Sequence, residues 1–324
     1  MNDMKPIKLA VLMDDIKDIK PYKDSSFAMM LEATRRHWEI YTFDAPQLFA
    51  QDGKTWATCA KTQVFDTTQN WYKKEAEVEL LLESFDVILM RKDPPFDMNY
   101  IYATYFLEQA EKSGVLVVNK PQSLRDANEK LFALNFPHCL ADTLVSSNPE
   151  QIKSFIKKQG VSVVKPLDGM GGKDIFKLEQ GDDNIHEVLD YLTHQGSTPI
   201  MAQEFLPEIA QGDKRILLIN GQPIDYALAR MPAKGSFKGN LAAGATGVGQ
   251  PLSARDRYLC EQIAPTLREK GLIFVGLDVI GDYITEINVT SPTCIRELDT
   301  QFNLNIAATL FDVIQEKLHS RLSN

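Results

Sequence analysis

The chain has 324 residues, of which 44% are hydrophobic, and its formal net charge is −9 at pH 7. Domains usually contain about 100–200 residues, so this length predicts two or three subdomains, each with an apolar core. The acidic balance gives the chain no general affinity for polyanions and argues against nucleic acid as a partner.

The cysteines and the apolar runs argue against two further classes of protein. The four cysteines lie far apart and form no Cys-x-x-Cys pair, which argues against a zinc site or a disulfide framework. No apolar run approaches the roughly 20 residues of a membrane-spanning helix, and two aspartates interrupt the first run. Neither a membrane segment nor a signal peptide is expected, and the cytoplasm is the default location.

Short apolar runs alternate with amphipathic stretches in the first 125 residues. The predicted strands of this region are 7–13, 38–43, 87–90 and 115–119. The predicted helices are 26–36, capped by Ser25 or Ser26, and 99–113. This alternation predicts a parallel sheet with helices on its faces, in an N-terminal α/β domain over 1–125.

A polar stretch that begins with a proline, 121–128, predicts a boundary, followed by a second lobe over 129–204 and a third over 205–324. The second lobe is predicted to contain helices at 129–136, 149–159 and 185–193, and strands at 161–166, 174–178 and 200–205. The third is predicted to contain two strands divided by Asn220-Gly221, a loop at 231–250, a helix at 254–270, a hairpin at 273–289 and a helix at 304–318.

In the second lobe, a lysine on a strand precedes a glycine-rich loop. Lys165 lies near the end of the strand 161–166, and Gly169, Gly171 and Gly172 follow it closely. Glycines let backbone N–H groups approach a phosphate, and the lysine adds a positive charge. The Walker pattern is excluded, because no Gly-Lys-Ser/Thr ends the loop. The alternative is a tight turn between two strands.

The hairpin of the third lobe carries candidate metal ligands. Glu286 and Asn288 are two residues apart on one strand, so they share a face, and such oxygen ligands suit magnesium. Asp278 joins them only if the turn is odd-numbered: a three-residue turn, 281–283, puts it opposite Glu286. A two-residue turn would put it on the other face. The alternative is an amphipathic hairpin with one wet face.

Four arginines beside turns and strand ends indicate an anionic substrate, because a guanidinium fork suits carboxylate or phosphate. Arg91 follows the strand 87–90 at its C-terminal end, where ligands bind in open α/β sheets. The other three are Arg215, Arg230 and Arg296.

The loop 231–250 contains five glycines. A loop of about 20 residues without secondary structure is uncommon, and we expect a lid that keeps water from the reaction. A surface insertion is the alternative.

Longer strings of residues carry a family resemblance. They are Met90-Arg91-Lys92-Asp93-Pro94-Pro95-Phe96-Asp97, Asn119-Lys120-Pro121-Gln122-Ser123-Leu124-Arg125-Asp126, Asn128-Glu129-Lys130-Leu131 and Thr285-Glu286-Ile287-Asn288-Val289-Thr290-Ser291-Pro292-Thr293. Over nearly its whole length the chain resembles the bacterial glutathione synthetases of the ATP-grasp superfamily. The resemblance implies the α/β ATP-grasp fold, in which an N-terminal parallel-sheet domain precedes two α+β lobes that enclose ATP.

The resemblance also implies an activity: ATP-dependent ligation of γ-glutamylcysteine and glycine to glutathione through an acyl phosphate, giving ADP and phosphate. It implies a homotetramer or homodimer. Two alternatives are another ATP-grasp ligase, such as a peptide or D-alanine ligase, and a regulator that binds ATP without turnover.

Residue roles follow from the same resemblance. It implies that ATP is bound by Lys130, Lys165, Gly169, Met170, Gly171, Gly172, Gln203, Glu204, Phe205, Leu206, Asp213, Lys238 and Asn240. It implies that Asp278, Glu286 and Asn288 hold Mg²⁺, with Mn²⁺ as the other candidate. It implies that γ-glutamylcysteine is held by Ser25, Ser26, Arg91 and Arg296, and that Arg215 and Arg230 face the reacting carboxylate. The family often has arginine at the position of Lys238, so the charge is kept there but the bidentate fork is not.

Overall fold

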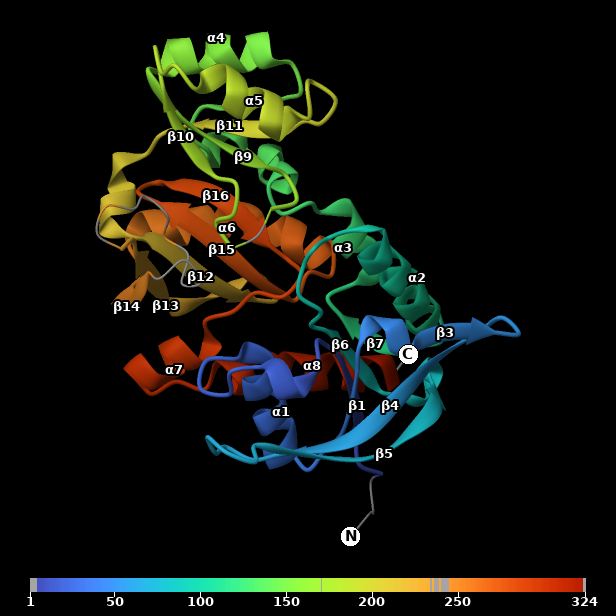
Figure 1. Ribbon diagram of the computed structural model, residues 1–324. Helices are drawn as coiled ribbons and strands as arrows, with labels where there is room; N and C mark the ends of the chain where they lie inside the picture. Colours follow the sequence, from blue (N-terminus) through green and yellow to red (C-terminus); the bar gives the residue numbers. More distant parts are fainter. Residues whose placement is uncertain (1–4, 170, 234, 236–238, 240–244, 323–324) are drawn as a thin grey trace.

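The structure is a computed structural model, and it describes residues 5–322 except 170, 234, 236–238 and 240–244. Three sheets follow one another along the chain (Figure 1). Among the helices of the described residues, none has the length and apolar character needed to cross a membrane. All four cysteines are buried and free.

The first sheet has the strand order β3-β4-β2-β1-β6-β7, and β5 pairs with β4. The predicted parallel pairing is confirmed for β2, β1, β6 and β7, but antiparallel β3, β4 and β5 make the sheet mixed. The sequence did not predict these three strands; β5, for example, is mostly exposed, and its alternation of Ala76, Val78 and Leu80 with glutamates was not interpreted as a strand. The strands are β1 (Lys8–Leu12), β2 (Glu39–Phe43), β3 (Leu48–Gln51), β4 (Lys54–Val64), β5 (Tyr72–Leu81), β6 (Val87–Met90) and β7 (Leu116–Val118).

Helices cover both faces of the first sheet. α1 (Ser25–Arg35) and α8 (Ile306–Leu322) pack on one face, and α2 (Met98–Lys112) packs on the other, with α3 (Pro121–Asp126) beside it. The prediction that a serine caps α1 was wrong. The cap is Asp24, whose carboxylate accepts a hydrogen bond from Phe27 N at 2.6 Å.

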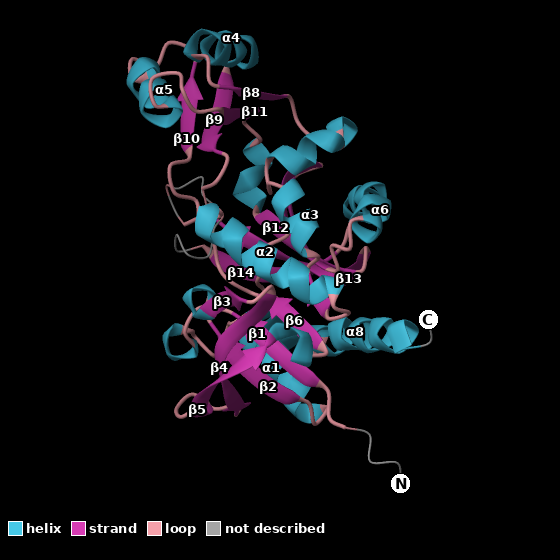
Figure 2. Cartoon of the chain, turned by 90° about the vertical axis from the view of Figure 1, so that its right-hand side faces the viewer, coloured by secondary structure: helices cyan, strands magenta, loops and turns pink. Residues whose placement is uncertain are grey.

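The second sheet is a small antiparallel unit with the order β10-β9-β11-β8. Its helices α4 (Pro149–Gln159) and α5 (Ile185–Thr193) cover the outer face, at the end of the molecule farthest from the N-terminus (Figures 1 and 2). Both helices and the strand at 161–166 have the predicted bounds, whereas the predicted helix 129–136 is a short 3-10 helix, Leu131–Asn135. The strands are β8 (Thr143–Ser146), β9 (Val161–Pro166), β10 (Phe176–Glu179) and β11 (Ile200–Glu204).

The third sheet is antiparallel, with the order β14-β13-β12-β15-β16. Its strands are β12 (Asp213–Ile219), β13 (Gln222–Met231), β14 (Thr246–Pro251), β15 (Phe274–Ile280) and β16 (Tyr283–Asn288). α6 (Ala254–Glu269) packs against β13. Two expectations need correction: the predicted loop 231–250 ends in a strand, and α7 (Ile295–Phe302) precedes the expected last helix.

The apolar cores divide the molecule differently from the sheets. Two large clusters each contain residues of both the first and the third sheet, such as Ala10 with Ile216 and Leu9 with Leu217. The second sheet and its helices have a core of their own, built around Ile152. The first and third sheets therefore form one packed body, and the second forms a smaller one. The predicted domain limits at 125 and 204 stay predictions.

Candidate active site

A cavity of about 540 Å³ lies where the three parts of the chain meet. The second sheet contributes Lys165 and the chain after β11, and the third sheet contributes Asp278 and Glu286. The segment before α1 contributes Lys20 and Lys23. A cavity with cationic and anionic walls suits a charged ligand together with a counter-ion.

The hairpin β15–β16 brings the three candidate metal ligands together by a route that the sequence did not predict. Its turn has two residues, since Ile280 pairs with Tyr283. A β-bulge at Thr285 then shifts the register, so that Asp278 lies opposite Glu286 and Asn288 opposite Gly276. The expectation that a two-residue turn would put Asp278 on the other face was wrong, because the extra residue in the bulge restores the shared face.

Asp278 is buried between two guanidinium groups. Arg215 Nε donates to Asp278 Oδ1 at 2.5 Å, and Arg215 Nη2 donates to Oδ2 at 3.0 Å. Arg230 Nη2 lies 3.0 Å from the same Oδ2. Burial alone would raise the pKa of Asp278, but the two arginines hold it well below its usual range. The carboxylate is therefore ionised over the physiological range.

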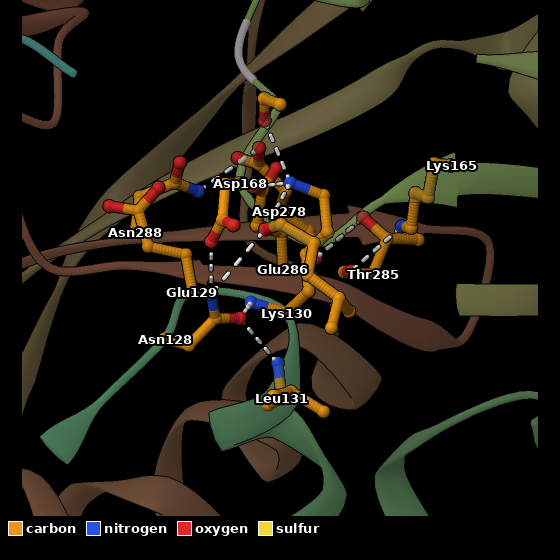
Figure 3. Close-up of polar contacts among 12 residues, drawn as sticks. Asn128, Glu129, Lys130, Leu131, Lys165, Asp168, Asp278, Thr285, Glu286 and Asn288 are labelled. Carbon is orange, nitrogen blue, oxygen red and sulfur yellow. Dashed lines mark hydrogen bonds and ion pairs between the residues drawn. The ribbon is translucent and has the colours of Figure 1, made fainter. Parts of the chain in front are cut away.

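Glu286 joins the hairpin to the glycine loop through Lys130. Lys130 Nζ lies 3.0 Å from Glu286 Oε1 and donates to Gly169 O at 2.8 Å and to Leu167 O at 3.4 Å (Figure 3). The predicted lysine, glycine loop and metal ligand are thus brought into contact.

Lys165 projects from β9 toward the same hairpin and donates to Thr285 O at 3.2 Å (Figure 3). Burial lowers the pKa of Lys165 to about 8, because removing the ammonium from water disfavours its charged form. An arriving phosphate would supply the missing negative charge.

The chain after β11 and the first residue of β12 form another wall of the cavity. Gln203, Glu204, Phe205 and Leu206 line it, and Gln203 Nε2 donates to Thr143 Oγ1 at 3.0 Å. Asp213 also lines it: its Oδ2 pairs with Arg230, while its Oδ1 is buried and has no hydrogen-bond partner among the described residues. Burial raises the pKa of Asp213 to about 6.

The four residues predicted to hold γ-glutamylcysteine do not line the cavity. Arg91 is buried behind it, and its guanidinium donates to Ser26 Oγ and to Pro292 O, both at 2.9 Å. Ser25 Oγ accepts from Ile295 N at 3.2 Å, and Arg296 pairs with Asp66 at 2.8 Å. Together, Arg91 and the two serines fasten the segment 291–295 to the start of α1.

Several cavity residues were not predicted. Glu129 is the clearest: its Oε1 accepts from Val289 N at 3.0 Å, Thr290 N at 3.1 Å and Thr290 Oγ1 at 2.7 Å. Burial raises the pKa of Glu129, and the negative charge of Glu286 raises it further. Its position next to Lys130 in the sequence is the feature from which Glu129 could have been predicted as a cavity residue. The other unpredicted acids and bases include Lys20, Lys23 and Glu297.

Three predicted nucleotide contacts, Met170, Lys238 and Asn240, lie outside the described residues. Between the last two, Gly239 is described and lies against the arginine–aspartate pair. A Cβ on it would lie 2.5 Å from Asp213 Cβ and 3.0 Å from Arg230 O. At Gly239, the predicted lid therefore packs against the third sheet.

The oxygen ligands on the hairpin fit a divalent cation. Two carboxylates face one another across the strands, and Asn288 Nδ2 donates to Asp278 Oδ2 and to Gly276 O at 3.2 Å each. These two bonds leave Asn288 Oδ1 as the amide atom available to a metal. Hard oxygen ligands from two carboxylates and an amide suit Mg²⁺ or Mn²⁺.

Comparisons with known proteins identify the family of the chain. Family models described as the N-terminal domain and the ATP-grasp domain of prokaryotic glutathione synthetase match residues 7–125 and 129–303. Glutathione synthetases from Pseudomonas syringae pv. tomato and Vibrio cholerae are 54% and 52% identical to the chain. These alignments cover 97% and 96% of the chain and 99% and 98% of the relatives.

Solved structures share the fold at low identity. D-cycloserine synthetase DcsG has a TM-score of 0.67 at 13% identity, covering 95% of this chain and 99% of the other. D-alanyl-alanine synthetase A from Vibrio cholerae has a TM-score of 0.59 at 11% identity, covering 97% and 99%. The fold is thus that of the ATP-grasp ligases, and the chain belongs to the prokaryotic glutathione synthetase family.

Proposed function

We propose that the cavity described above is where this chain, a glutathione synthetase, joins γ-glutamylcysteine to glycine, and that the reaction passes through an acyl phosphate. Use of ATP follows from membership of the family. One observation supports the location: the two lysines, the glycine loop and the three candidate metal ligands lie around a single cavity.

The nucleotide would lie between the second and third sheets. Lys130 and Lys165 would face its phosphates, because both ammonium groups are buried and already contact backbone carbonyls beside the cavity. The chain at 203–206 would hold the adenine, and Asp213 Oδ1 would accept a hydrogen bond from a ribose hydroxyl. Asp278, Glu286 and Asn288 would hold Mg²⁺ or Mn²⁺, which supplies neutralisation of phosphate charge when bound.

The reaction solves a problem of charge, because a carboxylate repels nucleophiles and its oxide is a poor leaving group. The cysteinyl carboxylate oxygen attacks the γ-phosphorus and ADP leaves. The glycine amine then attacks the acyl carbon, and phosphate leaves as the amine loses a proton. Arg215 and Arg230 would stabilise the oxyanion that forms, since their guanidinium groups already meet at one point on the cavity wall.

In this proposal, γ-glutamylcysteine is not contacted directly by the four residues predicted to hold it, Ser25, Ser26, Arg91 and Arg296. The first three would act by fixing the segment 291–295, whose Ser291 and Thr293 line the cavity. We also propose a cytoplasmic location. We further propose that the chain forms a homodimer or homotetramer, and light scattering of the purified protein measures this oligomeric state.

An isotope experiment tests the acyl phosphate. The purified chain is incubated with Mg-ATP, glycine and γ-glutamylcysteine labelled with ¹⁸O in the cysteinyl carboxylate. We expect equal amounts of glutathione and phosphate, with one ¹⁸O atom transferred to each phosphate. Unlabelled phosphate would rule out the acyl phosphate, and absence of glutathione would rule out the activity. Turnover with D-alanine or another amine acceptor instead would favour a different ligase, and nucleotide binding without turnover would favour a regulator.

A further inference from the structure

At the end of the cavity away from the second sheet, Glu297 presents an incompletely solvated carboxylate. It lies in the first turn of α7 and lines the cavity, yet its Oε2 is buried and has no hydrogen-bond partner among the described residues. A buried charged oxygen without a donor is costly, so a cation that reaches it gains more than it would from a solvated carboxylate.

The other acids at this end of the cavity are engaged or solvated. Asp24 uses its Oδ1 to cap α1 by accepting from Phe27 N. Asp18 and Asp93 are exposed, so water already solvates them. Glu297 is therefore the acid in this part of the cavity that is best prepared to receive a cation.

Cations stand close to this acid. Lys20 and Lys23 line the same end of the cavity, and the positive charge of Lys23 acts on Glu297. Arg215, which pairs with Asp278, also acts on it, so this end adjoins the place proposed for the reacting carboxylate. An acid beside lysines suits a ligand end that carries both an ammonium and a carboxylate.

We propose that Glu297 is a specificity-determining residue that receives the α-ammonium of the γ-glutamyl group, with Lys20 and Lys23 on the side of its α-carboxylate. This inference rests on the proposed function, because it takes γ-glutamylcysteine as the substrate. The enzyme thereby distinguishes the zwitterionic glutamyl end from an acyl group that has only a carboxylate.

A pair of substrates isolates this contact. N-glutarylcysteine has the same length and both carboxylates of γ-glutamylcysteine but lacks the ammonium. We expect Glu297→Gln to lower kcat/KM for γ-glutamylcysteine by about 10–100-fold, mainly through KM, because a hydrogen bond between charged groups is lost. On N-glutarylcysteine we expect the variant and the wild type to agree within about threefold, with the KM values for ATP and glycine unchanged.

A matched control separates recognition from stabilisation of the helix. Glu187 occupies the first turn of α5, so Glu187→Gln removes the same favourable charge from a helix N-terminus away from the cavity. We expect it to leave both substrates unaffected. A loss on both substrates by Glu297→Gln, or no loss on either, would overturn the inference.

The wild type alone also tests it. Equal use of γ-glutamylcysteine and N-glutarylcysteine by the wild type would show that the ammonium is not recognised. That result would overturn the inference even if Glu297→Gln failed to fold. If the wild type makes no product from γ-glutamylcysteine, the proposed function fails. If the wild type is active on γ-glutamylcysteine but Glu297→Gln loses activity on both substrates or on neither, only the role of Glu297 is overturned.

Discussion

The two antiparallel sheets that meet at the cavity differ in how they are supported. The third sheet shares its apolar core with the first, so the arginine–aspartate cluster is built on the larger packed body. The second sheet has its own small core and reaches the hairpin through polar contacts such as Lys165 to Thr285 O. In the proposed function, charges fixed on the large body would be preorganised for the reaction, and the small body would close over the nucleotide.

The largest effect is expected on the large body, at the proposed metal ligands. Glu286→Gln keeps the shape but removes the charge, so we expect kcat to fall about 10³-fold as the stabilisation of developing phosphoryl charge is lost. Glu286 is partly exposed but pairs with the buried Lys130, so the melting temperature should fall while the fold stays intact. Steady-state rates at saturating Mg-ATP measure the effect. The exposed Glu261→Gln is the control, and a near-normal kcat would remove Glu286 from the set of ligands.

On the small body, substitution of Lys165 should change activity and stability in opposite directions. Lys165→Met should lower kcat/KM for ATP about 10²-fold and yet stabilise the nucleotide-free protein by about 3 kcal/mol near pH 7, because the folded state disfavours the buried ammonium. Between pH 8 and the unfolded pKa near 10.5, the folded state holds fewer protons than the unfolded one. Wild-type stability should therefore rise in that window, and the advantage of the variant should disappear.

Urea unfolding of both proteins across this pH range measures the difference. The exposed Lys157→Met on α4 should show no such dependence on pH. A variant that is less stable than the wild type at pH 7 would contradict the burial argument.

The small body is also where the sequence predicted most accurately. α4 has an Asn148 cap at its start and Gly160 at its end, and an apolar face between them, so local signals fix its bounds. The large body depends on longer-range features. The bulge at Thr285 has no local signal, and it alone decides whether Asp278 faces Glu286.

In the candidate site, too, some residues could be predicted from local sequence and others depend on long-range folding. Residue types and family strings predicted the lysines and the oxygen ligands, which the structure brings together. They did not predict that Arg91 is buried against Ser26, because burial depends on how the segment 291–295 folds back over α1. Glu297 was missed because α7 itself was not predicted, being a short helix that begins just after Pro292.

The seam between β14 and α7 tests the packing of the large body. Gly249 N donates to Gln301 Oε1 at 2.6 Å, and a Cβ on Gly249 would overlap the Phe302 ring, which stacks on Tyr226. Gly249→Ala should therefore cost about 2 kcal/mol of stability through overpacking. The control Gly247→Ala meets the flexible side chain of Leu228, at 3.0 Å, and should cost less. Equal losses of unfolding free energy in urea for the two variants would show that the contact between β14 and α7 can rearrange to accept the added methyl group.

The smallest expected effect is a difference in hydrogen exchange between the small body and the large body. A body with a small core opens locally at lower free energy, so amides of β9 and β11 should exchange with deuterium about tenfold or more faster than amides of β12 and β15. Mg-ADP contacts both bodies in our proposal and should slow exchange more in the small one, since ligand binding stabilises the closed form. Mass spectrometry of peptides from the two sheets measures both differences. Equal exchange in the two sheets without nucleotide would mean that they open as one unit, and the small body could not then act as a separate cover.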